Sequence, residues 1–412
     1  METTKRPALP FSRRIRKTGL KATNFVATKG KQNMIIVAAL IVLIIIFAAL
    51  NKNFVSTYNI VSMAQSLAPY AILGLGVTFV IATGGIDLSI GTVCIASAVI
   101  AGKLYMIGMP LWMTIPVMLL IGTLFGFING ILVAKLKLPA FIATLGTMMF
   151  SRGLSAILVS IPNIFFPSGT WFNKVFSNAN GLPVGLFWVI GFAILCMYLM
   201  YKNKIGRYIL SIGSNEEATR LSGINTDTYK MIAYTISGIG AGIAAVFWAA
   251  SFPTVAAATG NGMELDAIAG VYIGGTSAAG GVASVAGSVV GAIMLVVIRS
   301  GLNFVLAKSS LDINSTYVTF VLTGVIVVVA VLMDVIKNKN ASKVKVETEA
   351  AKYKRTAKEK LEELNGELDL ALTDGSMNPQ QRQEKAAALR KEIEAFKAAS
   401  KTEHARLKQA QK

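Results

Sequence analysis

Cysteine, histidine and acidic residues are scarce in this chain of 412 residues. It has two cysteines, Cys94 and Cys196, each inside a separate apolar run, and one histidine, His404, in a polar tail. These residues support neither a disulfide framework nor a metal site, and no cofactor is predicted. The chain also lacks a Gly-x-x-x-x-Gly-Lys-Ser/Thr stretch, so it cannot bind ATP through a loop of that type, and we do not expect an enzyme.

The few acidic residues are unevenly distributed. Nine of the 21 precede Asn340, and the other twelve lie in the last 73 residues. This predicts a basic N-terminal segment (1–33), an apolar region (34–339) and a charged tail (340–412). With 54% apolar and 15% charged residues, the composition indicates a polytopic membrane protein. Before the tail, most basic residues stand in the N-terminal segment or in short loops beside apolar runs, so the net charge of +19 does not predict nucleic acid as a partner.

Apolar runs long enough to cross a bilayer predict an all-α fold with about ten transmembrane helices. A helix needs about 20 residues to cross about 30 Å of hydrocarbon. The predicted spans are residues 34–50, 60–82, 88–107, 111–134, 141–161, 186–201, 229–250, 265–279, 282–306 and 317–336. The first is interpreted as a retained span, since residues 51–53 offer no small-residue cleavage site. The eighth is short and glycine-rich, and we expect it to be re-entrant or broken.

Basic residues predict the orientation of these spans. If ten spans alternate, the loops on the N-terminal side carry 18 Lys and Arg and those on the other side carry four. The positive-inside tendency therefore places both termini in the cytoplasm. Arg152 and Arg299 fall within spans, and they need buried partners or a wet cavity.

A polar, glycine-rich segment separates the second and third spans. Its candidate residues are Gly84, Gly85, Asp87 and Ser89. An ionisable group at such a position is costly unless it faces protein or water, which predicts a translocation or gating site. Capping of the third span by Asp87, through the N–H groups of residues 89 or 90, is the structural alternative. A second candidate set follows later in the chain: Glu264, Asp266, Gly274 and Gly275. Doubled glycines at 84–85, 274–275 and 280–281 predict interrupted helices.

The largest loop on the predicted inner side contains a short capped helix. Ser214 or Asn215 can accept hydrogen bonds from the first exposed N–H groups, and Gly223 supplies a left-handed stop. Glu216 and Glu217 lie at the positive end of the helix dipole. Such a helix can be a docking site for a soluble partner or an ordinary solvated loop helix, and the residue spacing is compatible with both.

These segments together resemble the permeases of bacterial ABC importers for ribose and galactosides. The resemblance rests on three ordered blocks, residues 84–89, 206–225 and 264–277. It implies a homodimeric subunit of the bacterial cytoplasmic membrane that translocates a monosaccharide such as ribose, galactose or a galactoside. An extracytoplasmic binding protein and a separate cytoplasmic ATPase are the implied partners. The loop helix would dock into the ATPase as a coupling helix, and this role is carried over to Glu216, Glu217, Arg220 and Gly223. Nucleosides or branched-chain amino acids are alternative substrates, because related permeases handle both.

The positions of the acidic residues bear on the energy source. Proton or sodium coupling calls for several acidic or polar groups buried at mid-membrane. The candidates all fall at predicted span edges: Asp87, Glu264, Asp266, Asp312 and Asp334. This favours a separate ATPase over an ion-gradient-driven carrier, which is the less favoured alternative.

Spaced glycines predict helix packing and hint at an internal repeat. The pairs at 122/126, 238/242 and 287/291 fit the small-xxx-small spacing that lets helix backbones approach closely. An Asp-x-x-x-Gly pattern occurs at 87–91 and again at 266–270, on segments that run in opposite senses. An inverted repeat explains this pattern, and chance similarity explains it equally well.

The longest loop on the predicted outer side and the charged tail each have a recognisable sequence pattern. Residues 162–183 and 251–263 are expected to form a reversible docking surface, with Asn163, Trp171, Phe172, Asn173, Asn178 and Asn180 in the first segment. The tail carries 16 basic and 12 acidic residues, with apolar residues at helical spacing around a turn at 374–379. A short antiparallel helical pair and a partly disordered extension both fit this pattern.

Overall fold

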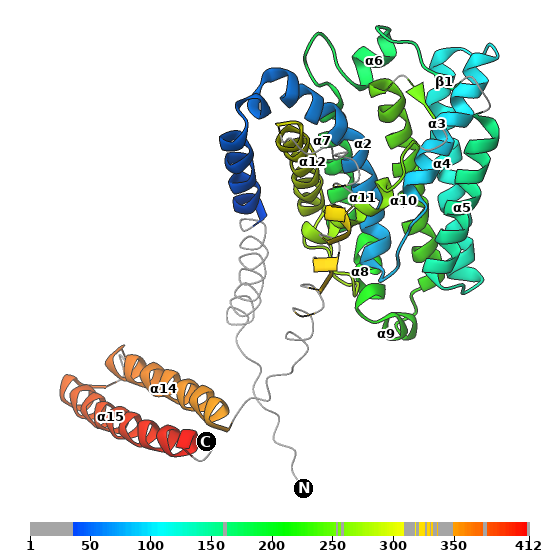
Figure 1. Cartoon of the computed structure of the whole chain (residues 1–412). Helices are drawn as coiled ribbons and strands as arrows, with labels where there is room; N and C mark the ends of the chain where they lie inside the picture. The colour runs from blue at the N-terminus through cyan, green and yellow to red at the C-terminus, as the bar shows by residue number, and fades with distance from the viewer. Residues whose placement is uncertain are drawn as a thin grey trace. The chain divides into compact units, whose positions relative to one another are not determined.

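The chain divides into two compact units, Met1–Asn338 (the membrane unit) and Lys339–Lys412 (the tail unit). The computed structural model describes residues 36–159, 163–252, 254–256, 259–308, 318, 321–325, 328–329, 331–332, 336, 349–373 and 377–409 (Figure 1). Asp312 and Asp334 lie outside these residues.

Helices of the membrane unit fall where the apolar runs predict them. The main ones are Ile36–Leu50, α2 (Thr57–Ala82), α3 (Ile90–Met106), α4 (Thr114–Gly130), α5 (Ala140–Leu158), α7 (Gly185–Met197), α10 (Thr226–Ser251), α11 (Met263–Ile273) and α12 (Val285–Lys308). Shorter pieces join or extend them: η1 (Lys52–Val55), η2 (Leu111–Met113), η3 (Ile131–Lys135), α6 (Trp171–Phe176), η4 (Tyr198–Lys202), α8 (Lys204–Ser214) and α9 (Glu216–Leu221). Within the tenth predicted span, the described residues between 318 and 336 are helical.

Six described helical segments are long and apolar enough to cross a membrane. They are Thr57–Ala82, Leu111–Lys135, Ala140–Leu158, Gly185–Lys202, Thr226–Ser251 and Val285–Leu306, while Ile36–Leu50 and α3 are shorter apolar helices. As expected, the eighth predicted span is short, because α11 has 11 residues and is about 16 Å long. The full count of ten spans stays a prediction.

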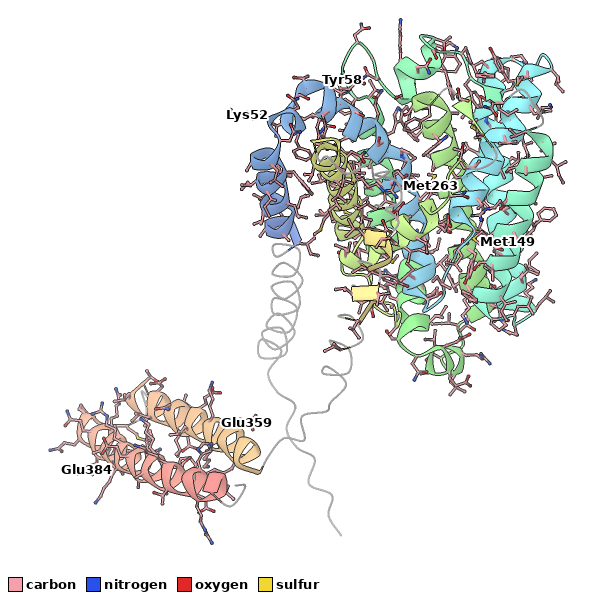
Figure 2. All side chains as sticks on the ribbon, in the orientation of Figure 1. Lys52, Tyr58, Met149, Met263, Glu359 and Glu384 are labelled. Atoms are coloured by element: carbon pink, nitrogen blue, oxygen red, sulfur yellow. The ribbon has the colours of Figure 1, made fainter. Side chains whose placement is uncertain are left out.

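The outside of the membrane unit is apolar. Large hydrophobic side chains such as Leu120, Phe150 and Ile157 are more than half exposed. Figure 2 shows Tyr58 and Met149 on this outer surface, whereas Met263 lies inside. Helices that are hydrophobic around their whole circumference are typical of membrane spans. The predicted all-α polytopic membrane fold is confirmed.

Helix α10 is a central helix of the membrane unit and packs against α2, α3 and α4. Its contact with α4 depends on glycine. A Cβ atom on Gly238 would lie 2.7 Å from the Cα atom of Gly126, and one on Gly242 would lie 2.7 Å from the carbonyl oxygen of Met118. Real Cβ atoms do not approach other atoms so closely, so the two backbones can touch only where side chains are absent. The predicted packing role of these glycines is confirmed.

Close backbone contact at glycines also joins α11 to α12. A Cβ atom on Gly287 would lie 2.8 Å from the carbonyl carbon of Gly274, and one on Gly291 would lie 2.7 Å from that of Gly270. Gly274, a candidate pathway residue, therefore has a packing role in this structure.

Connecting segments gather at two opposite ends of the membrane unit (Figure 1). At one end, β1 (Ile164–Phe165) pairs antiparallel with β2 (Thr254–Val255). At the other end, the N–H of Gly281 donates to the carbonyl oxygen of Ala82 at 3.0 Å, and Lys137 forms an ion pair with Asp227. Alternation of ten spans predicts this grouping of the loops. Which end faces the cytoplasm stays a prediction.

The tail unit consists of two helices, α14 (Glu349–Thr373) and α15 (Pro379–Gln409). They pack on each other through a line of apolar residues, and the buried ones are Ala357, Leu364, Ala371, Ala386 and Ile393. Asn378 caps α15 by accepting a hydrogen bond from the N–H of Gln381 at 2.8 Å. Of the two readings of the tail, the helical pair is the one that the structure has.

Candidate coupling and translocation site

The short helix α9 begins and ends as the sequence predicts. The side chain of Asn215 accepts a hydrogen bond from the N–H of Ala218 at 2.9 Å. Ser214, the other candidate cap, instead donates to the carbonyl oxygen of Leu210. Gly223 follows the helix with a φ of 81°, the left-handed conformation that favours glycine. The N-cap is therefore Asn215, and the predicted stop at Gly223 is confirmed.

Charged residues of α9 face in two directions. Glu216 forms an ion pair with Lys230 of α10 at 2.6 Å, and this bond ties α9 to the long helix. Arg220 lies 3.7 Å from both Glu216 and Glu217. The side chains of Glu217 and Arg220 are 68% and 55% exposed, and beside them Leu221 is 81% exposed. The exposed face of α9 thus combines charge with an apolar side chain, which suits a protein interface.

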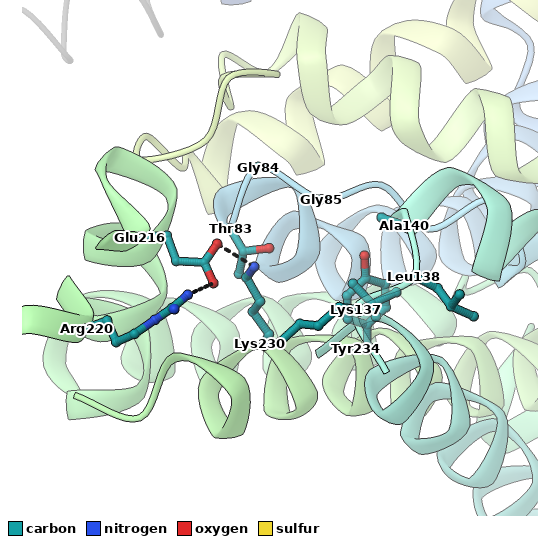
Figure 3. A pocket seen from close by; sticks show the side chains of 11 residues that line it. Thr83, Gly84, Gly85, Lys137, Leu138, Ala140, Glu216, Arg220, Lys230 and Tyr234 are labelled. Carbon is teal, nitrogen blue, oxygen red and sulfur yellow. Dashed lines mark hydrogen bonds and ion pairs between the residues drawn. The ribbon is translucent and has the colours of Figure 1, made fainter. Parts of the chain in front are cut away.

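A cavity of about 410 Å³ lies between α9 and the end of α2 (Figure 3). It is lined by Thr83, Gly84, Gly85, Val133, Lys137, Leu138, Ala140, Glu216, Arg220, Lys230 and Tyr234. Two candidate groups that lie more than 100 residues apart in the sequence therefore meet here. Gly84 and Gly85 of the glycine-rich segment share this cavity with Glu216 and Arg220 of the loop helix.

Both carboxylate oxygens of Asp87 accept hydrogen bonds. Asp87 is 1% exposed, and its Oδ1 atom accepts from the N–H of Ser89 at 3.0 Å and from the hydroxyl of Ser89 at 2.7 Å. Its Oδ2 atom accepts from the hydroxyl of Ser237 on α10 at 2.8 Å. The hydrogen bond to the Ser89 N–H is the one that the capping alternative predicts. The hydrogen bond to α10 was not predicted.

This network continues into two more helices. The Asn129 amide on α4 donates to the Ser89 hydroxyl at 2.8 Å, and the Thr147 hydroxyl on α5 donates to Asn129 at 2.6 Å. Buried polar groups in a membrane protein are expensive unless they bond to one another, and these side chains form a continuous chain. The loop between α2 and α3 is consequently fixed to three helices.

Asp266 belongs to a second buried cluster. It forms an ion pair with Arg299, whose guanidinium also donates to the Tyr70 hydroxyl at 2.6 Å. Thr323 donates to the other carboxylate oxygen at 3.3 Å. The adjacent cavity has a volume of about 10 Å³, which is no more than one water requires. Arg299 thus has the buried partner that its position in a span demands, and a pathway role of Asp266 stays a prediction.

Glu264 lies in the first turn of α11 and is 5% exposed. Its Oε2 atom faces Gly91 of α3, where a Cβ atom would clash with it. Across the part of the chain that the structure describes, no hydrogen bond reaches this oxygen or the Nε atom of Arg152. The assignment of Glu264 to the pathway also stays a prediction.

The doubled glycines interrupt helices as predicted. Gly84 has a φ of 81° just after α2, and Gly275 has a φ of 88° just after α11. Gly280 and Gly281, both with positive φ, precede α12. The last residues of α8 contact the end of α2 and the segment before α12. A Cβ atom on Gly213 would clash with the Ala82 carbonyl and the Gly281 N–H. The end of α8 is therefore in close backbone contact with the end of α2 and with the segment that precedes α12.

The two segments of the predicted docking surface lie together, whereas a docking role for them stays a prediction. They meet through β1 and β2, and Asn173 donates to the Ala250 carbonyl at 2.9 Å. Phe165 and Trp171 are about half exposed on this surface. Phe172 is wrong as a surface residue, because it is completely buried against Phe166 and Phe176. Asn163 is exposed, and Asn178 and Asn180 shape the following turn.

Sequence reasoning missed the polar face of α10. Lys230, Tyr234 and Ser237 contact Glu216, the loop after α2 and Asp87, respectively. The available signal was their spacing of four and three residues, which places three polar side chains on one face of the helix.

The candidate coupling and translocation residues lie in a part of the chain that is similar to known proteins. Residues 59–331 match the protein family described as "Branched-chain amino acid transport system / permease component". The chain belongs to this permease family. The segment contains every candidate coupling and translocation residue and ends before the tail unit.

Curated relatives of this permease are import proteins. The ribose import permease of Haemophilus influenzae is 37% identical over 301 residues, which cover 72% of this chain and 91% of the relative. That of Escherichia coli K12 is 35% identical over 308 residues, with the same coverage. A fructose import permease of Bifidobacterium longum is 34% identical over 299 residues, which cover 69% of this chain and 84% of the relative. No solved structure matches the permease.

Proposed function

We propose that this permease is the membrane subunit of an ATP-binding-cassette importer for a monosaccharide, with ribose as the first candidate. The observation that carries the proposal is its identity of 33–37% with ribose import permeases over about nine tenths of their length. The composition supports it. A neutral polyhydroxyl solute needs no fixed countercharge, and the buried carboxylates Asp87 and Asp266 are already bonded within the protein.

A separate ATPase supplies the energy in this proposal. The chain has no phosphate-binding loop for ATP. Its capped helix α9 presents Glu217, Arg220 and Leu221 to solvent, and its inner side lines the cavity beside Gly84 and Gly85. A subunit that docks on α9 can therefore act on the loop between α2 and α3.

The remaining partners follow from the other end of the membrane unit. An extracytoplasmic sugar-binding protein docks on the surface around β1, β2 and α6, where Phe165 and Trp171 are exposed. A second copy of the chain completes the pathway as a homodimer. Both termini lie in the cytoplasm of a bacterium, because 18 basic loop residues then face inward and four face outward.

Branched-chain amino acids are the second candidate substrate, because the family description names them. Such a substrate carries an ammonium and a carboxylate, and its pathway would need groups that replace the hydration of both charges. Competition distinguishes the candidates: excess unlabelled ribose, but not excess leucine, should block uptake of labelled ribose.

The test is uptake into proteoliposomes that contain the permease, its ATPase and its binding protein. Labelled ribose should accumulate only with ATP and binding protein present. The double variant Glu217→Lys with Arg220→Glu should insert normally but lose uptake, since charge reversal opposes docking. Glu384→Lys, an exposed reversal in the tail unit, is the matched control. Normal uptake by the double variant would contradict the coupling role of α9.

A further inference from the structure

Three polar side chains on one face of α10 connect the loop helix to the buried carboxylate of the glycine-rich segment. Lys230, Tyr234 and Ser237 are separated by four and three residues, so they point to the same side of the helix. At the lower end Lys230 forms its ion pair with Glu216 of α9 at 2.6 Å. At the upper end Ser237 donates to Asp87 at 2.8 Å.

Tyr234 occupies the position between these two contacts. Its hydroxyl donates to the carbonyl oxygen of Ile86 at 3.3 Å, and a Cβ atom on Gly85 would lie 2.7 Å from that hydroxyl. Tyr234 is 1% exposed, and the Lys230 side chain is 19% exposed. Figure 3 shows Lys230, Tyr234 and Glu216 around the cavity that Gly84 and Gly85 also line.

We propose that the Lys230–Tyr234–Ser237 face of α10 transmits displacement of α9 to the loop that holds Asp87, and that these three are positioning residues for transport. The proposal rests on the proposed function, since it assumes that an ATPase moves α9. A rigid helix with a bond at each end converts a shift of α9 into a shift of residues 85–89. These residues are in turn bonded to α4 through Ser89 and Asn129, and Asn129 is bonded to α5. The displacement therefore reaches α4 and α5 as well.

Rigid coupling requires that the helix cannot slide freely, and glycine contacts supply that restraint. Gly238 and Gly242 of α10 lie directly against the backbone of α4. On the other side, a Cβ atom on Gly76 of α2 would lie 3.3 Å from the Cα atoms of both Ser237 and Gly240. Helices packed at backbone distance move together or not at all, because packed cores are not continuously deformable.

The experiment measures ribose imported per ATP hydrolysed in the complete reconstituted complex. Ser237→Ala should lower this ratio about tenfold, which corresponds to loss of one hydrogen bond to a charged group, while ATP hydrolysis continues. Lys230→Met and Tyr234→Phe should lower it in the same direction. Thr235→Val is the matched control, because the Thr235 hydroxyl bonds, among the residues that the structure describes, only to the Met231 carbonyl of its own helix.

Two further results decide the proposal. The double variant Lys230→Met with Ser237→Ala should lose no more than the larger single loss, since both substitutions interrupt one path. The proposal is overturned if the ratio stays at the wild-type value in all three single variants, if Thr235→Val lowers it equally, or if the two losses add. A purely structural role would reduce the yield of folded complex without changing the ratio. If the wild-type complex shows no ATP-driven uptake, the proposed function itself fails, and the relay fails with it.

Discussion

Substitution of Gly238 by alanine tests the packing of the two central helices. The new Cβ atom would meet backbone atoms of α4, including the Cα of Gly126 at 2.7 Å and its N atom at 2.8 Å. Ordinary van der Waals contact begins near 3.4 Å. The deficit to the Gly126 Cα atom is about 0.7 Å, and the carbonyl oxygen of Gly122 lies nearer still. Backbone atoms cannot rotate aside, so α4 and α10 must separate.

The magnitude follows from two opposing effects. Overpacking of this kind costs about 1–3 kcal/mol of folding free energy. Alanine in place of glycine inside a helix stabilises the folded state by about 1 kcal/mol, because alanine has the higher helix propensity. Gly146→Ala in α5 is the matched control, since a Cβ atom there has open space, and it should keep the propensity gain alone. The difference between the two variants should therefore be about 1–3 kcal/mol, with Gly238→Ala the less stable.

The two cysteines provide the assay. Cys94 and Cys196 are free and buried, so a thiol-reactive fluorogenic dye reports unfolding of the detergent-solubilised protein. Gly238→Ala should melt several degrees below Gly146→Ala, and Gly146→Ala should melt at or above the wild type. A melting temperature of Gly238→Ala equal to that of Gly146→Ala would refute the argument from close backbone packing.

Three further predictions concern two single contacts and the tail unit. Arg299→Leu leaves the buried Asp266 carboxylate without its cation and should cost about 3–5 kcal/mol in the same melting assay, with partial recovery when Asp266→Asn is added. Asn215→Ala should speed hydrogen exchange in residues 216–221, because the lost cap is worth about 1 kcal/mol, whereas Ser214→Ala should not. Deletion of residues 341–412 should leave membrane insertion unchanged, because the tail forms its own compact unit. A regulatory or ATPase-contacting role of the tail is a hypothesis, and unchanged uptake and assembly after that deletion would exclude it.

Local chemistry made much of the fold predictable. Apolar runs of about 20 residues mark most of the helices, since a bilayer leaves few other structures possible. The capped helix at 216–221 and the interruptions at Gly84 and Gly275 also follow from short sequence patterns, because caps and left-handed residues depend on immediate neighbours.

Contacts between distant segments were not predictable in the same way. Glycine spacing indicates that residues 238 and 242 pack closely, but it does not name α4 as the partner. The short-range hydrogen bond from the Ser89 N–H to Asp87 is predictable from the sequence, whereas the bond from Ser237, 150 residues away, depends on how α10 packs. The mixture of polar and aromatic residues in the outer loop predicts Phe172 on the surface, yet its ring is buried in an aromatic cluster.

The dependence on a separate ATPase is tested most directly with the permease reconstituted alone. Vesicles that contain only this chain are given labelled ribose together with a proton or sodium gradient. We predict that the internal concentration of ribose never exceeds the external one, and that accumulation begins when the ATPase, the binding protein and ATP are added. Accumulation by the lone permease would contradict the account.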